Sequence, residues 1–224
     1  MRHPFDPTLY LVTDSTLCSP RPVADVVRAA VAGGVTAVQV RNKDASRRDL
    51  LTLTRSVQAA VADHPQVAVV VNDAVDVALL AGADGVHVGQ DDLPVQEVRA
   101  LVGPDLHVGL SVSSTTELDV ALALPAGTID LLGLSPIWDT PVKPDAAPAL
   151  GVAGVTALAA TARAAGMTAV AIGGITVDRA AEAAATGVDG LCVVSAICAA
   201  SDPAAAARDL RAEIARSRTV GIAS

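Results

Sequence analysis

The sequence predicts a (β/α)8 barrel, the TIM-barrel fold, in a single domain that takes up the whole chain, residues 1–224. Three observations lead to this fold class. Strand-like and helix-like segments alternate strictly, eight such pairs can be placed, and one short pattern occurs four times. Strict alternation indicates a parallel sheet with right-handed crossovers, and barrels of this class commonly reach this length as one domain.

The composition suits such a sheet. Hydrophobic residues make up 51% of the chain and aromatic residues 1%. The core must therefore consist of Val, Leu, Ile and Ala, which are typical of parallel strands buried on both faces.

The repeated pattern is an Ala-rich helical end, a Gly, a short turn and an apolar strand. A Gly near a helix end fits a left-handed cap, and the β-branched run after it fits a strand. Each copy therefore marks a helix-to-strand join. The four copies are residues 32–40, 81–89, 164–172 and 186–194.

Between these joins the remaining elements can be assigned by periodicity. Val23, Val26, Val27 and Val31, for example, follow helical spacing. Strands are expected at residues 8–13, 36–40, 67–71, 84–88, 106–110, 129–134, 168–172 and 189–194. Helices are expected at residues 22–32, 46–62, 74–80, 94–102, 115–123, 152–165, 176–185 and 203–215, with an irregular tail from about residue 216. Eight units favour closure into a barrel, and an open Rossmann-like sheet is the alternative.

Charge and motifs exclude several classes of function. The net charge of -8 and pI of about 4.8 leave no basic footprint for nucleic acid. No apolar run approaches the roughly 20 residues that span a membrane, and the N-terminus lacks the apolar core of a signal peptide, so we expect a cytoplasmic protein. The three cysteines match no metal motif and are expected to be free thiols. No serine-hydrolase, zinc-protease or dinucleotide-binding motif is present.

Polar residues gather just after the predicted strands, where barrel enzymes carry their active sites. They are Gln39, Arg41, Lys43, Asn72, Asp73, Gln90, Asp91, Asp92, Ser111, Thr140, Lys143 and Ser195. His87 lies within the fourth strand, where a packed, hydrogen-bonded role and a proton-shuttle role are both open.

Asp73 and Asp92 follow neighbouring strands and form a candidate Mg²⁺ site. Mg²⁺ takes one or two carboxylates and completes its octahedron with water and phosphate oxygens. The alternative is that each aspartate only caps the helix that follows it.

Cations surround this expected metal site. Arg41, Lys43 and Lys143 all fall in rim loops, and the latter two are the only lysines of the chain. They are candidates for phosphate contacts, and solvated loop charges are the alternative. Gly173-Gly174-Ile175 and Ser195-Ala196 follow the last two strands, where backbone N–H groups commonly hold a phosphate.

These residues, in this order, resemble the thiamine-phosphate synthase family. The stretches that carry the resemblance are LYLVTD (9–14), VQVRNKD (38–44), VND (71–73), GADGVHVGQDDLP (82–94), GLSVSS (109–114), SPIWDTPVK (135–143), AIGGI (171–175) and VVSAI (193–197). Together they span nearly the whole chain.

The resemblance implies a transferase of thiamine biosynthesis. Such enzymes join 4-amino-5-hydroxymethyl-2-methylpyrimidine diphosphate to a thiazole phosphate, with or without a carboxylate on the thiazole, and release diphosphate with the help of Mg²⁺. Small-molecule substrates are then the expected partners, with no membrane or nucleic acid, and the sequence leaves a homo-oligomer open.

The resemblance also implies residue roles. Asp73 and Asp92 would bind Mg²⁺, and Arg41, Ser111 and Lys143 would be catalytic. The implied substrate-binding residues are Gln39, Val40, Arg41, Asn42, Lys43, Asn72, Ser111, Thr140, Pro141, Val142, Lys143, Gly174, Val194 and Ser195. The sequence departs from the family pattern at Ser135, commonly Gly, and at Val142, commonly Thr, so one hydroxyl contact to phosphate is in doubt.

This chemistry needs no covalent intermediate and no strong base, since cations can neutralise the leaving diphosphate. Two other functions are open from the sequence. One is a thiazole tautomerase-like isomerase, against which the aspartate pair and the QVRNK stretch count. The other is a non-catalytic barrel that binds a phosphorylated metabolite.

Overall fold

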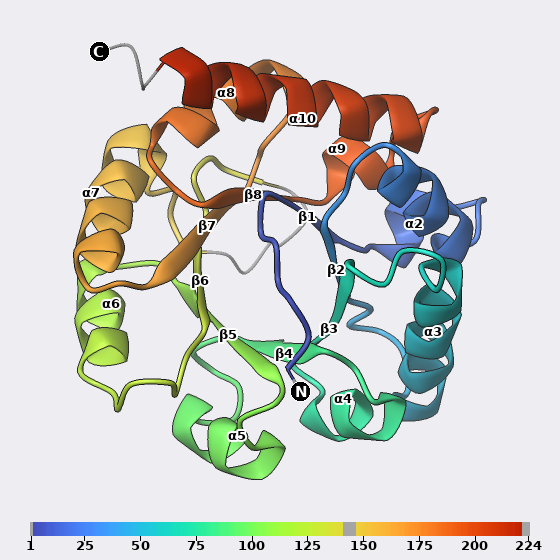
Figure 1. Ribbon diagram of the computed structural model, residues 1–224, viewed down its shortest axis with the longest axis horizontal. Helices are drawn as coiled ribbons and strands as arrows, with labels where there is room; N and C mark the ends of the chain where they lie inside the picture. Colours follow the sequence, from blue (N-terminus) through green and yellow to red (C-terminus); the bar gives the residue numbers. More distant parts are fainter. Residues whose placement is uncertain (1, 141–146, 221–224) are drawn as a thin grey trace.

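The eight apolar runs form a closed barrel of parallel strands in the order β1 to β8 (Figure 1). The computed structural model describes residues 2–140 and 147–220. The strands are β1 (Leu9–Val12), β2 (Ala37–Val40), β3 (Ala68–Asn72), β4 (Gly85–Val88), β5 (His107–Val112), β6 (Leu131–Leu134), β7 (Thr168–Ile172) and β8 (Gly190–Val193). Closure of the barrel confirms the predicted fold class and excludes the open sheet.

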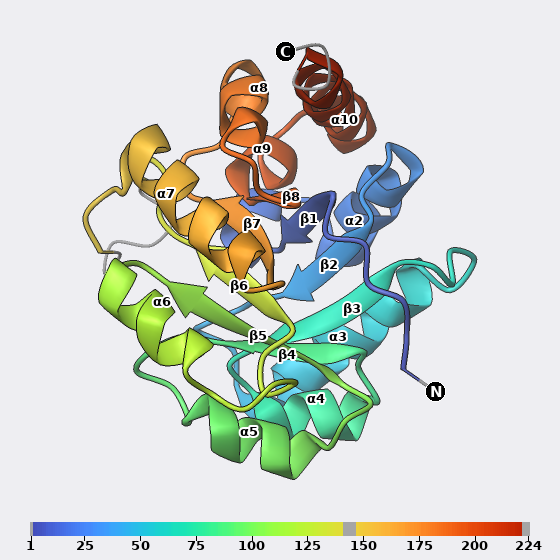
Figure 2. The ribbon, with the colours of Figure 1, turned by 60° about the vertical axis from the view of Figure 1, so that its left-hand side comes forward.

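Helices surround the barrel as an outer layer (Figure 2). They are α1 (Ser15–Cys18), α2 (Val23–Ala32), α3 (Arg47–Ala60), α4 (Val75–Ala81), α5 (Val95–Val102), α6 (Thr115–Leu122), α7 (Gly151–Ala164), α8 (Val177–Ala185), α9 (Ser195–Cys198) and α10 (Pro203–Val220). Each predicted strand is present within two residues of its expected ends, as are the predicted helices apart from the last. The irregular tail expected from about residue 216 is wrong, because α10 continues to Val220.

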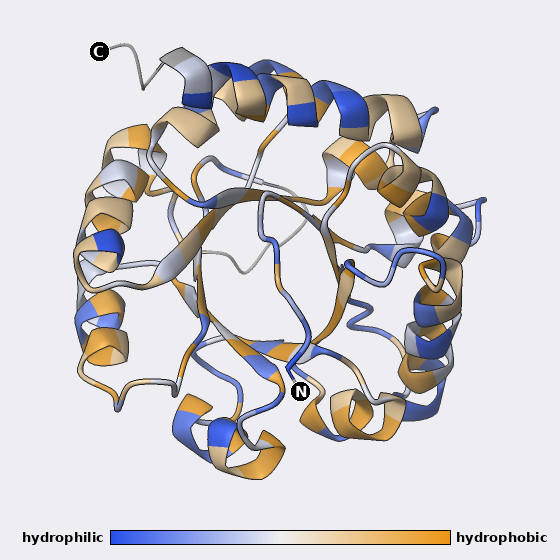
Figure 3. Ribbon diagram, in the orientation of Figure 1, coloured by the Kyte–Doolittle hydropathy of each residue, from blue (hydrophilic) through white to orange (hydrophobic). Residues whose placement is uncertain are grey.

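Strand side chains alternate between two cores. On β1, Leu9 and Leu11 pack outward against the helices, whereas Tyr10 and Val12 point into the barrel. The outer core is the larger of the two and contains the apolar faces of the helices. In Figure 3, hydrophilic and hydrophobic turns alternate along α3 and α10, as expected for helices with one covered face.

The amino ends of the strands are fastened by a repeated contact. The side chains of Thr36, Asp84, Asp130 and Asp189 precede the four even-numbered strands. Each accepts a hydrogen bond from a backbone N–H of the strand before it, namely Leu9, Val69, Val108 and Ala169, at 3.0, 2.8, 2.8 and 2.8 Å. Thr36, Asp84 and Asp189 fall within three of the four copies of the sequence pattern, and the contacts satisfy donors at the strand starts.

The N-terminal segment crosses this end of the barrel (Figure 1). Arg2 forms an ion pair with Asp130, which also pairs with Arg99. Phe5 packs edge-on against Tyr10, with ring centroids 5.6 Å apart. The segment therefore closes the end of the barrel opposite the carboxyl ends of the strands.

No helix among residues 2–140 and 147–220 is long and apolar enough to cross a membrane. The three cysteines, Cys18, Cys192 and Cys198, are free and buried.

Candidate active site

A cavity of about 530 Å³ lies at the carboxyl ends of the strands. All eight strands or the loops directly after them contribute to its lining. The sequence-predicted residues that the structure brings together here are Gln39, Arg41, Lys43, Asn72, Asp73, Asp92, Ser111, Thr140, Gly174, Val194 and Ser195.

The floor of the cavity includes a buried polar pair. Gln39 points into the barrel from β2, and its Nε2 donates to the hydroxyl of Tyr10 at 3.0 Å. Burial raises the pKa of Tyr10 well above its usual value, so this hydroxyl stays neutral. The hydrogen bond fixes the orientation of the Gln39 amide at the floor.

A second polar pair, His87 and Ser111, lies across the barrel from Gln39 and Tyr10. The Nε2 atom of His87 on β4 lies 3.0 Å from the hydroxyl of Ser111 on β5. Glycines make room for this imidazole, because a Cβ at Gly109 would collide with the ring and one at Gly133 would approach it to 3.2 Å. His87 is therefore packed and hydrogen-bonded, which is one of the two roles that the sequence left open.

The two aspartates meet at one side of the cavity. Burial, and then the neighbouring Asp92 carboxyl, raise the pKa of Asp73 to about 6, although the charge of Lys43 opposes this shift. The Asp92 carboxylate accepts the N–H of Gly89 at 2.7 Å. Asp73 has a positive φ of 59°, which non-glycine residues rarely adopt.

The capping alternative for these aspartates is wrong. The N-cap residues of α4 and α5 are Ala74 and Pro94, and neither helix has a side-chain cap. Each carboxylate is directed to the other and to the cavity instead of to a helix end.

Arg41 and Lys43 bring positive charge to the same side. The Arg41 guanidinium lies 3.6 Å from the Asp14 carboxylate, and both side chains are largely buried. Thr13 accepts the backbone N–H of Arg41 at 3.0 Å. Arg41 is thus held in place, whereas Lys43 is exposed at the rim.

The glycine-rich loop after β7 and the start of α9 lie on the opposite side of the cavity. Gly173 and Gly174 have positive φ angles of 110° and 64°, and a Cβ at Gly173 would come within 2.6 Å of Pro136. Gly174, Ile175, Val194 and Ser195 all line the cavity. We call Gly173, Gly174, Ile175, Ser195 and Ala196 the phosphate cradle, because loops after the last two strands of a barrel commonly bind phosphate in this way.

A model of the thiamine monophosphate synthase family matches residues 9–197 of the chain. This match covers most of the barrel, from the first strand to the short helix after the last.

The chain belongs to the thiamine monophosphate synthase family.

Relatives of similar length agree with the family match. The thiamine-phosphate synthase of Albidiferax ferrireducens is 46% identical over 203 residues, which cover 91% of this chain and 90% of that protein. The enzyme of the same name from Laribacter hongkongensis is 46% identical over 213 residues, covering 95% and 97% of the two chains. The structure of thiamine phosphate pyrophosphorylase from Pyrococcus furiosus superposes with a TM-score of 0.83 at 33% identity, and covers 95% of this chain and 97% of that one.

Some residues that the family resemblance implies are not in the cavity lining. Val40 is fully buried in the outer core, because it faces the helices one position after Gln39. Asn42 donates to the hydroxyl of Ser15 at 3.1 Å and accepts the N–H of Asp44, so it shapes the loop after β2. Pro141, Val142 and Lys143 lie outside the described residues.

Some polar residues of the cavity lining were missed as site residues, namely Tyr10, Ser113 and Glu117, whereas Gln90 was expected at the rim and is found there. Gln90 donates to the carbonyl of Ser111 at 2.7 Å, and Glu117 accepts the backbone N–H of Ser113 at 2.6 Å. Strand alternation could have found Tyr10, which faces inward like Val12, but the loop contacts have no local sequence signal.

Proposed function

We propose that this chain joins 4-amino-5-hydroxymethyl-2-methylpyrimidine diphosphate to 4-methyl-5-(2-phosphoethyl)thiazole, or its carboxylated form, to give thiamine phosphate and diphosphate. The observation that supports the proposal is that one cavity has two different sides, each of which offers groups suited to an anion or its metal ion. An aspartate pair with cations lies on one side, and a cradle of backbone donors lies on the other.

The aspartate pair fits Mg²⁺. Burial, and then the adjacent Asp92 carboxyl, raise the pKa of Asp73 to about 6, so a cation beside the two carboxylates would stabilise their charged forms. Among the described residues, no third acidic, His or Cys side chain joins them into a metal-binding group. Mg²⁺ prefers such open sites, in which substrate phosphates and water supply the remaining ligands. When bound, Mg²⁺ would neutralise charge on the diphosphate.

Arg41 and Lys43 would bind the diphosphate beside the aspartates. Loss of the leaving group places negative charge on its bridging oxygen, and fixed cations stabilise that charge without having to reorganise. Arg41 is held for this role by Asp14, 3.6 Å away. Lys143, which lies outside the described residues, stays a prediction for the same role.

The floor of the cavity would orient the pyrimidine. Gln39 and Asn72 offer amide groups, and Ser111 offers a hydroxyl that His87 holds at 3.0 Å. These groups can both donate and accept hydrogen bonds, as an aminopyrimidine requires.

The phosphate cradle would hold the thiazole phosphate and so direct its ring nitrogen toward the pyrimidine methylene carbon. Backbone N–H groups of Gly174 and Ser195 would contact phosphate oxygens, with Thr140 at the edge of the cavity. The sequence-implied contacts from Pro141 and Val142 stay predictions. Because binding alone places the nucleophile, no side-chain base is required.

An assay with both substrates tests this function. Purified protein is mixed with the pyrimidine diphosphate, the thiazole phosphate and Mg²⁺, and thiamine phosphate and diphosphate are measured by chromatography. We expect product only when all three are present, loss of product with EDTA and recovery with excess Mg²⁺.

The same assay tests the other two functions. Isomerisation of the thiazole phosphate without the pyrimidine would indicate a tautomerase. Binding of either compound without turnover would indicate a non-catalytic metabolite-binding barrel.

Lys143 can be tested in this assay. Lys143→Ala should slow turnover by about 10²–10³-fold, as loss of a charge-stabilising group at the reacting centre does, with an unchanged circular dichroism spectrum. Arg208→Met on α10 removes one positive charge from the outer layer and serves as the control. Near-normal turnover of Lys143→Ala would contradict the role given to Lys143.

We also propose that the reaction takes place in the cytoplasm, which three free, buried thiols support.

A further inference from the structure

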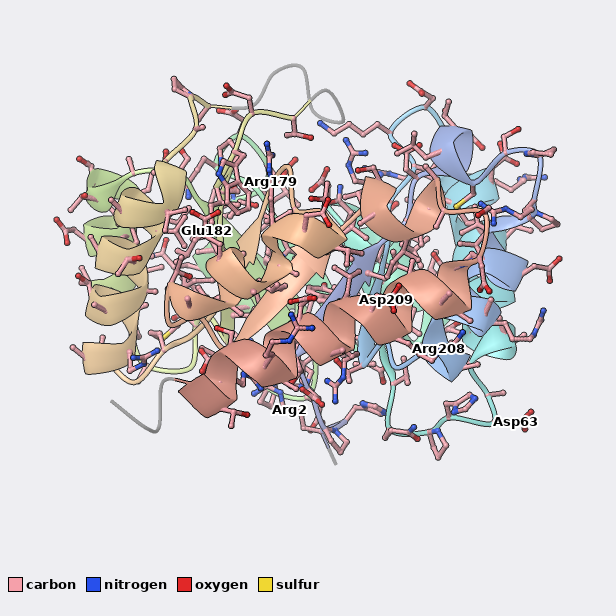
Figure 4. The ribbon with its side chains drawn as sticks, turned by 90° about the horizontal axis from the view of Figure 1, so that it is seen from above. Arg2, Asp63, Arg179, Glu182, Arg208 and Asp209 are labelled. Carbon is pink, nitrogen blue, oxygen red and sulfur yellow. The ribbon has the colours of Figure 1, made fainter. Side chains whose placement is uncertain are left out.

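An arginine behind the phosphate cradle has no role in the function proposed above. Arg179 lies in the first turn of α8, and its guanidinium carbon is 5.1 Å from the centre of the Trp138 ring, in a cation–π contact. Its Nη1 atom also donates to the carbonyl oxygen of Gly174 at 3.2 Å. Figure 4 shows Arg179 at the opposite side of the molecule from Arg2, which fastens the amino ends of the strands.

Trp138 is itself bound to the cradle. Its backbone N–H donates to the carbonyl of Gly173 at 3.2 Å. A Cβ at Gly174 would lie 2.9 Å from the Cβ of Trp138 and 3.0 Å from the carbonyl oxygen of Asp139. The residues after β6 therefore pack directly against the two glycines, without an intervening side chain.

The contact with Gly174 sets the direction of a phosphate donor. In a trans peptide the C=O and the following N–H point in opposite directions. When Arg179 holds the carbonyl of Gly174, it also fixes the N–H of Ile175, which belongs to the cradle. Gly174 needs such support because its backbone is the most permissive of any residue.

We propose that Arg179 is a positioning residue for the phosphate of the thiazole substrate. By stacking on Trp138 and binding Gly174 it keeps the two glycines and the start of the β6–α7 connection in the arrangement that receives phosphate. This inference rests on the proposed function for the identity of the substrate, but not for the binding of phosphate itself.

Phosphate binding can be measured without catalysis. Trp138 is the only tryptophan of the chain, so its fluorescence reports on this place alone. Wild-type protein, Arg179→Met and Arg179→Lys are titrated with inorganic phosphate at constant ionic strength, with Arg208→Met as the control for loss of one exposed positive charge. We expect a saturable change in the wild type, a dissociation constant about three- to fivefold higher in Arg179→Met, as loss of an exposed cation–π contact implies, and no change in Arg208→Met.

The lysine variant separates positioning from charge. Lysine keeps the positive charge but has no planar fork that can stack on Trp138 and bind Gly174 together. Arg179→Lys should therefore bind phosphate nearly as weakly as Arg179→Met. Wild-type affinity in Arg179→Lys would mean that charge alone acts, and would overturn the proposal. Wild-type affinity in Arg179→Met, or no saturable signal in the wild type, would overturn it as well.

Kinetics provide a second readout. In the full reaction, Arg179→Met should raise KM for the thiazole phosphate about three- to fivefold, with KM for the pyrimidine diphosphate unchanged. An equal rise in both KM values would indicate a general structural defect and would count against Arg179. If wild-type protein binds inorganic phosphate but forms no thiamine phosphate, the proposed function fails while the role of Arg179 in phosphate binding stands.

Discussion

Asp73, the proposed metal ligand, occupies a position that should lower the stability of the metal-free protein. Its backbone is in the left-handed region, and its carboxyl group lies beside that of Asp92, with a pKa raised to about 6 from the usual 3.8. The folded protein therefore holds this proton more tightly than the unfolded chain does. Without metal, stability should fall as the pH rises from about 4 to 6, because the carboxylate form is disfavoured in the fold.

Asp73→Asn tests this trade-off. Asparagine cannot ionise and is among the residues that best tolerate a positive φ. At pH 7 the metal-free variant should be more stable than the wild type by about 1 kcal/mol, since partial exposure lets solvent screen the repulsion. Turnover with Mg²⁺ should fall steeply. Denaturant unfolding at pH 5 and pH 7 measures the first effect, and the gain in stability should shrink at pH 5. A less stable variant at pH 7 would contradict the cost of keeping a charged carboxylate at this partly buried position beside Asp92.

At the same scale, the sequence predicted which polar side chains meet, but not how each is held. Gln39, Asp73 and Ser111 could be placed because parallel strands end at one edge. The Asp14–Arg41 ion pair and the Gln90 contact could not, since they depend on loop conformations. Val40 was predicted to bind substrate because it lies within the stretch VQVRNKD that resembles the family. Strand alternation directs its side chain away from the cavity.

At the level of elements, strands and long helices follow from hydrophobic periodicity, and short elements do not. The helices α1 and α9 have four residues each, which is about one turn and too short for a period to appear. The last helix was predicted to end at residue 215, but it continues to Val220. Its final turns, near Arg216 and Arg218, contain few apolar residues from which a period could be recognised. The last buried apolar residue of α10 is Ile214, and the helix continues beyond it with mostly polar residues.

Within β5, Gly109 is required by the His87 ring. In Gly109→Ala the added methyl group would collide with the imidazole. We expect a loss of about 1–3 kcal/mol in the free energy of unfolding and slower turnover, since Ser111 would lose its partner. If the collision is the cause, the double variant Gly109→Ala, His87→Ala should regain much of the stability. Additive losses in chemical denaturation would contradict this explanation.

At the scale of the whole molecule, the two ends of the barrel differ in what they contain. The carboxyl ends of the strands carry the cavity, and the amino ends carry the repeated Asp and Thr contacts. Asp130 is the most heavily used of these groups, since it binds Arg2, Arg99 and the N–H of Val108. Substitutions here should change stability and leave catalysis intact.

Asp130→Asn and Asp84→Asn form a matched pair for this division. Both keep an oxygen for the strand N–H, but only Asp130→Asn leaves two guanidinium groups without their carboxylate. Asp130→Asn should lower the free energy of unfolding by about 2–3 kcal/mol, and Asp84→Asn by less than about 1 kcal/mol. Thermal denaturation compares the two. At temperatures where both variants are folded, kcat and KM should match the wild type, and a tenfold fall in kcat for Asp130→Asn would contradict the separation of the two ends.

The pairing of β1 with β8 joins the first and the last strand of the barrel in chain order. Until the eighth strand has left the ribosome, the nascent sheet has two unpaired edges, and such edges are templates for association with other chains. α10 then packs against both α2 and α8 and covers the seam. Truncated chains that stop before residue 190 would lack β8 and would thus be open sheets prone to aggregation.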